Sequence, residues 1–454
     1  MSTLEHEIEV VRRAQALRVE GCVSELRGLS IYVDELPAPV GALVSIRSEG
    51  SRRVPAEVVG FSGHRAIVMP LSQASGIRVG DRVTVVEREQ SVRVSRTLLG
   101  RVLNGFGQPV DGGLALSGGL PRLLNPEPQR AMARMRVTQP IRTGVAAIDL
   151  MTPMGKGQRV GIFAGPGVGK STLLSQIARG TDAQINVIAL IGERGREVRE
   201  FIEDALGQDG LSRSVVVVST SDESPLLRLR AARLACSIAE YFRDDGLDVM
   251  LMMDSITRFA HAQRQVGLAV GEPPATRGYT PSVFANLPML LERAGGCETS
   301  GGSITGLYTI LVEGDDMTEP IADAARGVLD GHLILSRKLA HRGQFPAIDV
   351  LDSVSRVAEV VSDQAHRSAR QQLIRLEAKY RDIEELVQIG AYAKGSDPDA
   401  DVAIALHDSI CALIRQRDSD RTPFESRRAE LIALAMRAGD LFQQQAQGGR
   451  GQRN

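Results

Sequence analysis

Residues 159–171 read RVGIFAGPGVGKS, and this stretch decides the fold. An apolar run passes through a glycine-rich turn into STLLSQIARG, a helical pattern that ends at Gly180. A strand, such a turn and a helix that opens with Lys-Ser form a phosphate-binding loop, because glycines let backbone N–H groups face phosphates and the helix N-terminus adds positive charge. The turn therefore predicts a nucleotide site made of Gly165, Pro166, Gly167, Val168, Gly169, Lys170, Ser171 and Thr172.

Two side chains of this turn have predicted roles toward ATP and Mg²⁺. Lys170 would meet the β- and γ-phosphates, and the hydroxyl of Ser171 would ligate the magnesium ion. The first glycine of the usual pattern is Ala164 here. Because that position closes the strand and does not touch phosphate, the predicted site is unaffected.

Charged residues that follow two other apolar runs add to the predicted site. Asp254 ends DVMLMMD, where a phosphate-binding-loop protein places the aspartate that holds magnesium. Glu193 and Arg194 follow NVIALIG; the carboxylate could polarise the attacking water, and the arginine could neutralise charge developing on the phosphate. The residues alone leave a second interpretation open, in which Glu193 pairs with Arg194 or Arg196 as ordinary surface charge.

The stretch from about Thr138 to Val360 has the pattern of an α/β fold. Six apolar runs alternate with amphipathic helical patterns and are expected as strands: RVGIFAG, NVIALIG, SVVVVST, DVMLMMD, GLYTILVEG and HLILS. Runs this uniformly apolar fit parallel strands that are buried on both faces. We therefore expect a parallel sheet covered by helices within residues 96–362, which begin with a Pro- and Gly-rich linker.

The flanks of this domain have different textures. Residues 21–95 hold short β-type runs separated by glycines (VGALVSI, AEVVGF, RAIVMPL, VGDRVTVV), the pattern of a small β-barrel. Residues 363–440 have apolar side chains at helical spacing and predict a helical domain. The polar, glycine-rich residues 441–454 predict a disordered tail.

Residues 1–20 are predicted to form an amphipathic helix, since Leu4, Ile8, Val11 and Leu17 recur at roughly helical spacing among charged residues. A helix this short is marginal in water on its own. Its apolar stripe is expected to dock on a partner. The alternative left open is that it folds back onto the barrel.

Composition argues against several classes of protein. Lys and Arg number 54 against 55 Asp and Glu, with no long basic run, which disfavours a nucleic-acid binder. No apolar run approaches the ~20 residues of a membrane-spanning helix, and the N-terminus is too charged for a secretory signal. The cysteines (Cys22, Cys236, Cys297, Cys411) include no C-x-x-C pair and are expected as reduced thiols of a cytoplasmic protein, not as disulfides or zinc ligands.

A longer set of motifs resembles one family. GERGREVREF, DSITRFAHAQR, GEPPATRGYTPSVF, VEGDD, DGHLILSRKLA and FPAIDVLDSVSR resemble the ATPases of type III protein export, relatives of the catalytic subunits of rotary ATP synthases. The resemblance runs from about residue 20 to 440. GERGREV followed by EF is closer to the export ATPases than to the synthase subunit, which would read GERTREG. VVGFSGHRAIVMPL resembles the flagellar branch, with the injectisome branch a close second.

The resemblance implies a RecA-like ATPase domain and roles for residues whose chemistry the pattern leaves open. Glu193 matches the glutamate that activates water, where non-catalytic synthase subunits carry glutamine. Arg194 and Arg258 match arginines near the γ-phosphate, and Arg356 matches an arginine finger that reaches into the neighbouring subunit's site. Phe345 matches the aromatic position that stacks on adenine; without the resemblance it would be expected in the core.

The resemblance also implies partners. The active species would be a ring, a homo-hexamer, that energises flagellar export and releases or unfolds export substrates and chaperones at its C-terminal domain. A regulatory stator-like protein would bind the N-terminal helix, a central stalk protein would contact the ring, and the export gate would hold it at the inner face of the cytoplasmic membrane. No nucleic acid is implied. The acidic loop 395–401 either contacts the stalk or is a solvated turn.

Three rival functions are weighed against this one. GERGREVREF and the barrel motif argue against a rotary synthase catalytic subunit. An RNA-translocating hexameric ATPase would need exposed aromatics and basic loops in the barrel, which has few aromatics beyond Tyr32 and Phe61. A nucleotide-binding scaffold without turnover is disfavoured because Lys170 and Glu193 are both present.

Overall fold

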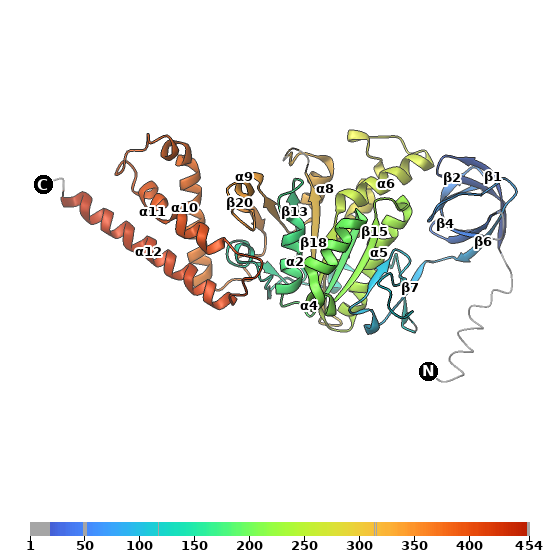
Figure 1. The fold of residues 1–454 in the computed structure, drawn as a ribbon, viewed down its shortest axis with the longest axis horizontal. Coiled ribbons are helices and arrows are strands. Elements are labelled where there is room, and N and C mark those ends of the chain that lie inside the picture. The colour runs from blue at the N-terminus through green and yellow to red at the C-terminus, as the bar shows by residue number, and fades with distance from the viewer. Residues whose placement is uncertain (1–18, 49–51, 117, 313, 315, 452–454) are drawn as a thin grey trace.

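Three parts follow one another along the long axis of the molecule: a barrel, a sheet flanked by helices, and a helical domain (Figure 1). The computed structural model describes residues 19–48, 52–116, 118–312, 314 and 316–451. Of the helix predicted for residues 1–20, all but the last two residues lie outside the described residues, and Glu20 begins a strand. The arrangement confirms the predicted fold class. None of the helices in these ranges is both long and apolar enough to cross a membrane.

The barrel closes on itself in the strand order β1-β2-β5-β4-β3-β6. Alternate side chains fill its interior: Val44 and Ile46 of β3, and Val54 and Val58 of β4, are fully buried. Closure leaves no free strand edge for another chain to pair with. The strands are β1 (Glu20–Arg27), β2 (Ser30–Asp34), β3 (Leu43–Arg47), β4 (Arg53–Ser62), β5 (Arg65–Pro70) and β6 (Arg82–Glu87).

The segment that joins the barrel to the sheet is partly structured. β7 (Ser91–Val94) pairs with β9 (Leu120–Leu123) in a separate two-stranded sheet. Between them, β8 (Val102–Asn104) joins the central sheet in parallel with β15 (Ser214–Thr220). The LNGFGQPVDGG stretch, predicted as linker, thus begins with the end of an edge strand, which was missed because β8 has only three residues.

The central sheet has the strand order β20-β19-β13-β18-β16-β14-β15-β8. Its six strands predicted from apolar runs pair in parallel with one another, as expected. At one edge β20 runs antiparallel to β19, and it was not among the predicted strands. The bounds are β13 (Arg159–Ala164), β14 (Ile185–Glu193), β16 (Asp248–Asp254), β18 (Ser303–Leu311), β19 (Gly331–Leu335) and β20 (Ile348–Ser355). Two short strands lie off this order: β17 (Gly295–Cys297) pairs with the beginning of β18, and β10 (Arg134–Met135) pairs with β17. A separate two-stranded sheet consists of β11 (Pro140–Ile141) and β12 (Met154–Gly155).

Helices cover both faces of the sheet, and successive residues of one strand enter different cores. Val187 and Ala189 of β14 pack in the core with α5 and α6, whereas Ile188 and Leu190 pack in the core with α2. This explains why the predicted strands read as unbroken apolar runs. The helices of this domain are α2 (Lys170–Gly180), α3 (Gly195–Glu200), α4 (Gly207–Ser212), α5 (Pro225–Asp244), α6 (Ile256–Val270), α7 (Pro281–Leu291), α8 (Pro320–Val328) and α9 (Arg337–His341).

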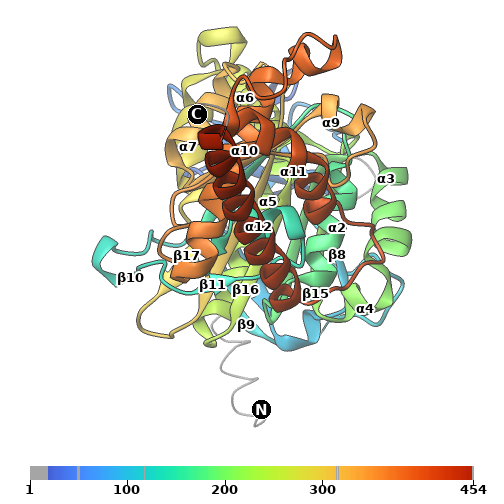
Figure 2. The ribbon, with the colours of Figure 1, turned by 90° about the vertical axis from the view of Figure 1, so that its left-hand side faces the viewer.

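The C-terminal part consists of α10 (Gln364–Gln388), α11 (Pro398–Ile414) and α12 (Phe424–Gly451). In the view along the long axis, these three helices lie in front of the sheet domain (Figure 2). The predicted disordered tail is wrong for residues 441–451, which continue α12. Leu441 and Phe442 pack against the core that α2 shares with the helical domain, and Gln443, Gln444 and Gln445, which follow them, are good helix formers.

Candidate functional site

The loop between β13 and α2 has the backbone that its glycines predict. Gly167 and Gly169 have φ of 78° and 92°, a region that other residues rarely adopt. Val168 is buried in the core beneath the loop and anchors it. Ser171 and Thr172 are exposed in the first turn of α2, so their hydroxyls are accessible to a ligand above the loop.

Lys170 joins the loop to two neighbouring strands. Its Nζ donates a hydrogen bond of 2.6 Å to Oδ1 of Asp254 and lies 3.7 Å from Oε1 of Glu193. Both carboxylates stand at the carboxyl ends of parallel strands, which meet at one edge of the sheet. The structure therefore brings together three residues predicted separately from three motifs.

Glu193 has the environment of a general base. Its side chain is only 10% exposed, and Oε1 is buried without a hydrogen-bond partner among the described residues. Burial first, and then the charge of Asp254, raise the pKa of Glu193 to about 7, although nearby cations act in the opposite direction. A carboxyl group with a pKa near neutrality and an oxygen that accepts no hydrogen bond is suited to accept a proton from water.

The predicted arginines at this end of the sheet differ in position. The guanidinium of Arg258, on α6, donates to the carbonyl of Gly192 and lies 3.3 Å from Oε2 of Glu193. Arg194 points elsewhere: its side chain is 78% exposed and pairs with Glu197. The surface-charge interpretation of Glu193 does not hold, because Arg194 has that other partner and Arg196 pairs with Glu200.

Phe345 lies beside the loop, not in the core. The nearest atoms of its ring are 4.0 Å from where a Cβ on Gly169 would stand, and the residue is 47% exposed. It lines a cavity of about 390 Å³ together with Val168 and Thr172. An exposed aromatic face at such a cavity is suited to stack on a nucleotide base.

Arg356 is the predicted site residue that lies far from the others. It follows β20, is exposed, and its backbone N donates to the carbonyl of Asp330 at 3.0 Å. Asp330 also pairs with Arg159, the first residue of β13, whereas the phosphate-binding loop follows the last. Five residue steps along β13 separate the two ends by roughly 16 Å. Arg356 therefore lies near the amino end of β13, whereas the phosphate-binding loop of the same chain lies at the carboxyl end.

Two contributions to the site were not predicted from the sequence. The cavity beside Phe345 is closed on one side by residues 415–418, an irregular segment between α11 and α12 that matches no motif. Thr309, near the carboxyl end of β18, donates a 2.7 Å hydrogen bond to Oδ1 of Asp254 and orients that carboxylate. A threonine close to the end of the apolar run GLYTILVEG was the available clue to Thr309.

Models of known families match all three parts of the chain. Residues 23–86 match the β-barrel domain of the ATP synthase alpha/beta family, and residues 144–355 match its nucleotide-binding domain. Residues 362–433 match the C-terminal domain of the T3SS EscN ATPase. The matched ranges follow the barrel, the sheet domain and the helical domain of the structure.

Individual proteins are similar over nearly the whole chain. The flagellum-specific ATP synthase of Bacillus subtilis (strain 168) is 47% identical, over 93% of this chain and 95% of that protein. The type 3 secretion system ATPase of Xanthomonas euvesicatoria is 48% identical, over 94% and 95%. The assembled ATPase EscN of the enteropathogenic E. coli type III secretion system, solved in complex with its central stalk EscO, superposes with a TM-score of 0.84 at 43% identity, over 91% of this chain and 100% of that one.

Proposed function

This chain belongs to the flagellar and type III secretion ATPases, within the ATP synthase alpha/beta family, and is an ATPase; from this premise we propose that it hydrolyses MgATP to energise protein export through a flagellar export apparatus. The observation that carries the proposal is the meeting of Lys170, Glu193 and Asp254 at one edge of the sheet. The barrel motif and the name of the Bacillus relative favour the flagellar branch. Secretion through an injectisome is the second candidate, favoured by the equally similar Xanthomonas ATPase.

The chemical step would be attack of water on the γ-phosphate, in line with the leaving oxygen. Glu193 would orient that water through Oε1, which accepts no hydrogen bond from the described residues, and accept its proton. Lys170 would exchange its contact with Asp254 for the phosphates, and Arg258 would hold Glu193 in place. Phe345 would provide the stacking face for adenine.

The oxygen donors of the site fit a magnesium ion. The hydroxyl of Ser171 and the carboxylate of Asp254 are hard ligands of the kind that Mg²⁺ prefers, and Thr309 keeps the carboxylate oriented. When bound, the ion would neutralise charge on the phosphate oxygens. It would be held by few protein ligands, as is usual for magnesium at nucleotide sites.

The position of Arg356 supports a ring as the active species, and we place the subunit number at six on the family resemblance. An arginine at the opposite edge of the sheet can complete a site only on another subunit. Rings are built from head-to-tail interfaces, which present such an edge to a neighbour's nucleotide site. The similar ATPase EscN is described as assembled, in agreement with this.

The remaining partners belong to the same proposal. A central stalk protein would contact the C-terminal helices, as the complex of EscN with EscO suggests by similarity. A stator-like regulator would bind the N-terminal helix, and chaperones with their export substrates would bind the C-terminal domain. The protein would work in the cytoplasm, at the export gate on the inner face of the membrane.

A complementation experiment in two hosts tests the function. The chain is expressed in Bacillus subtilis lacking its flagellum-specific ATP synthase, and in Xanthomonas euvesicatoria lacking its type 3 secretion ATPase. We expect motility to return in the first host and effector secretion to stay absent in the second, with Lys170→Ala inactive in both. Restored secretion without restored motility would contradict the flagellar assignment.

A further inference from the structure

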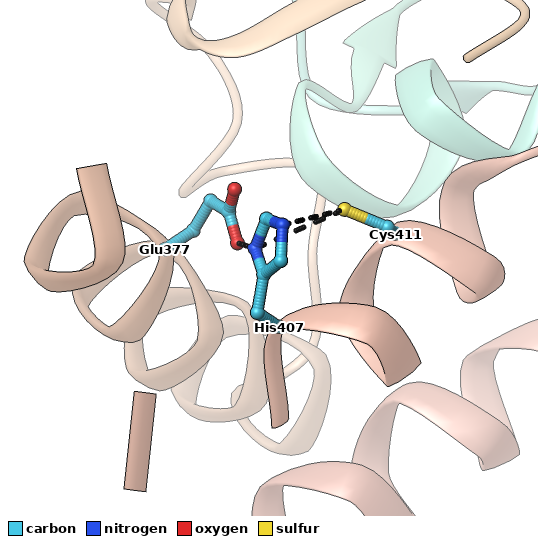
Figure 3. Close-up of side chains that lie close together, drawn as sticks. All are labelled: Glu377, His407 and Cys411. Atoms are coloured by element: carbon cyan, nitrogen blue, oxygen red, sulfur yellow. Dashed lines mark hydrogen bonds and ion pairs between the residues drawn. The ribbon is translucent and has the colours of Figure 1, made fainter. Parts of the chain in front are cut away.

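A cluster of potential metal ligands lies in the helical domain, away from the nucleotide loop. Figure 3 shows the side chains of Glu377, from α10, and of His407 and Cys411, from α11, pointing toward one another. Oε2 of Glu377 is 3.0 Å from Nδ1 of His407, and Sγ of Cys411 is 3.6 Å from Nε2 and 3.9 Å from Nδ1 of the same ring. One ligand atom from each residue lies within 4.8 Å of the others.

The backbone and a neighbouring ring hold this cluster in place. His407 and Cys411 are four residues apart on α11, so they stand on one face of the helix, one turn from each other. The imidazole stacks on Tyr380 with 3.6 Å between ring centroids and 9° between planes. Stacking therefore holds the imidazole in place, and the side chains of Cys411 and Glu377 would adjust around it.

We propose that Glu377, His407 and Cys411 bind a divalent transition-metal ion of the zinc class. Thiolate and imidazole are the donors that Zn²⁺ selects, and a carboxylate completes a three-ligand set. Zinc bonds of about 2.0–2.3 Å in a tetrahedral arrangement put neighbouring ligand atoms roughly 3.3–3.8 Å apart. With Nδ1 of His407 as the imidazole ligand, Oε2 of Glu377 at 3.0 Å and Sγ of Cys411 at 3.9 Å need shifts of a few tenths of an ångström. Glu377 and Cys411 start from a separation of at most 4.8 Å and would move toward each other to reach this range.

The surroundings provide access for the ion and a fourth ligand. The cluster lines a cavity of about 400 Å³ between the helical domain and the α9–β20 segment, and the side chains of Glu377 and His407 are each 19% exposed. Glu384, on the cavity wall, is already paired with Lys338 and Arg342. A water molecule entering from the cavity would be the fourth ligand, as in zinc sites that keep an open position.

The competing interpretation is a Glu377–His407 ion pair beside an inert thiol. Burial lowers the pKa of His407, but hydrogen bonds with Cys411 and Glu377 outweigh it and raise that pKa to about 10. A metal would displace this proton, so the two interpretations differ in what occupies the space between the three groups. The expectation that no cysteine ligates zinc rested on the missing C-x-x-C pair, and this cluster joins ligands 30 residues apart, which no short motif marks.

The ion would also stiffen a region next to the adenine cavity. It would bridge α10 to α11, and the backbone carbonyl of Cys411 accepts a 3.2 Å hydrogen bond from Nε2 of Gln344. Gln344 directly precedes Phe345. Bound metal should therefore raise the thermal midpoint of the helical domain and of the segment that carries Phe345.

The test uses the full-length chain, stripped of metal by a chelator and free of nucleotide, with Co²⁺ as the spectroscopic probe. We expect one equivalent of Co²⁺ to give a thiolate-to-cobalt charge-transfer band that Zn²⁺ removes. Cys411→Ser and His407→Gln should abolish the band, and Glu377→Gln should weaken binding ~10-fold or more. As matched controls, Cys22→Ser and His64→Gln change an exposed cysteine and an exposed histidine of the barrel and should leave the band unchanged.

Stability gives a second, independent measurement. Zn²⁺ should raise the thermal midpoint of the wild-type chain and of both barrel controls, and should leave the midpoint of Cys411→Ser and His407→Gln unchanged. The ATPase rate of the metal-free variants should match wild type, because neither residue contacts the nucleotide loop. Absence of a thiolate band, or a band that survives Cys411→Ser, would overturn the proposal.

Discussion

The location of Arg356 makes a quantitative prediction about mixed assemblies. Roughly 16 Å of β13 separate its end of the sheet from the end that carries the phosphate-binding loop, so it contributes nothing to the site of its own chain. Arginine fingers contribute about 10³–10⁵ to the rate of phosphoryl transfer. We therefore expect Arg356→Ala to lose activity on that scale while each chain still binds ATP.

Mixing separates action on the same chain from action on a neighbour. Glu193→Gln chains have a dead site but an intact Arg356, and Arg356→Ala chains have the reverse. Each is inactive alone. In rings assembled at random from equal amounts of the two, about a quarter of the interfaces join an intact Glu193 to an intact Arg356, so about a quarter of the wild-type rate should return.

The measurement is steady-state phosphate release, with ring formation followed in parallel by native mass spectrometry. The matched control is Arg326→Ala, another exposed arginine lining the same surface cavity as Arg356, which should stay within tenfold of wild type. If mixed rings form and no activity returns, Arg356 does not complete a neighbour's site, and the proposed ring mechanism is wrong.

Four further predictions concern single features of the chain. Lys170→Ala should lower turnover ~10²-fold or more, because a preorganised charge at the phosphates is lost, and a rate within tenfold of wild type would exclude the loop assignment. Glu193 works as a carboxylate, so its pKa of about 7 predicts that kcat falls as pH is lowered through neutrality; a flat profile would argue against a general base. Asp363 caps the N-terminus of α10, and hydrogen bonds from Arg428 and from the backbone N of His366 lower its pKa to about 2. Asp363→Ala should therefore lower the free energy of unfolding in urea by ~1 kcal/mol above pH ~4, and the difference from wild type should shrink as pH falls toward 2. Deleting residues 2–18 should leave the thermal midpoint and the basal ATPase rate unchanged and abolish assembly and partner binding; a large drop in midpoint with binding retained would favour folding back onto the barrel.

The parts of the site that the sequence predicted share one physical property. Lys170, Glu193 and Asp254 each follow a strand whose residues are apolar on both faces, and parallel strands bring their carboxyl ends to one edge. The apolar pattern of each strand and the parallel order of the strands therefore bring these three residues together. The roles of Arg356 and Phe345 depended on a family resemblance, because an exposed arginine and a half-exposed phenylalanine have no diagnostic environment of their own.

What the sequence could not predict depends on distant packing. Residues 415–418 line the cavity beside Phe345 only because the helical domain folds back against the sheet domain, a contact between segments about 70 residues apart in the chain. The side chain of Arg194 is exposed and pairs with Glu197 one turn along α3, so in this structure it points away from the phosphate-binding loop. The tail from residue 441 was assigned by composition, and the contacts of Leu441 and Phe442 with the core outweigh that signal.

Gln416, in the segment between α11 and α12, forms hydrogen bonds that join this segment to the cavity beside Phe345. Its backbone N donates to the carbonyl of Phe345 at 2.9 Å, and its buried side chain accepts from the N of Ala146 and donates to the carbonyl of Gly144. Because these hydrogen bonds join Phe345 and residues 144–146 to the segment before α12, we expect a rotation of the C-terminal helices to shift the ring of Phe345. If that ring stacks on adenine as proposed, a partner that binds the helices in one orientation should change the affinity for the nucleotide, and by reciprocity the nucleotide should change the affinity for that partner by the same factor.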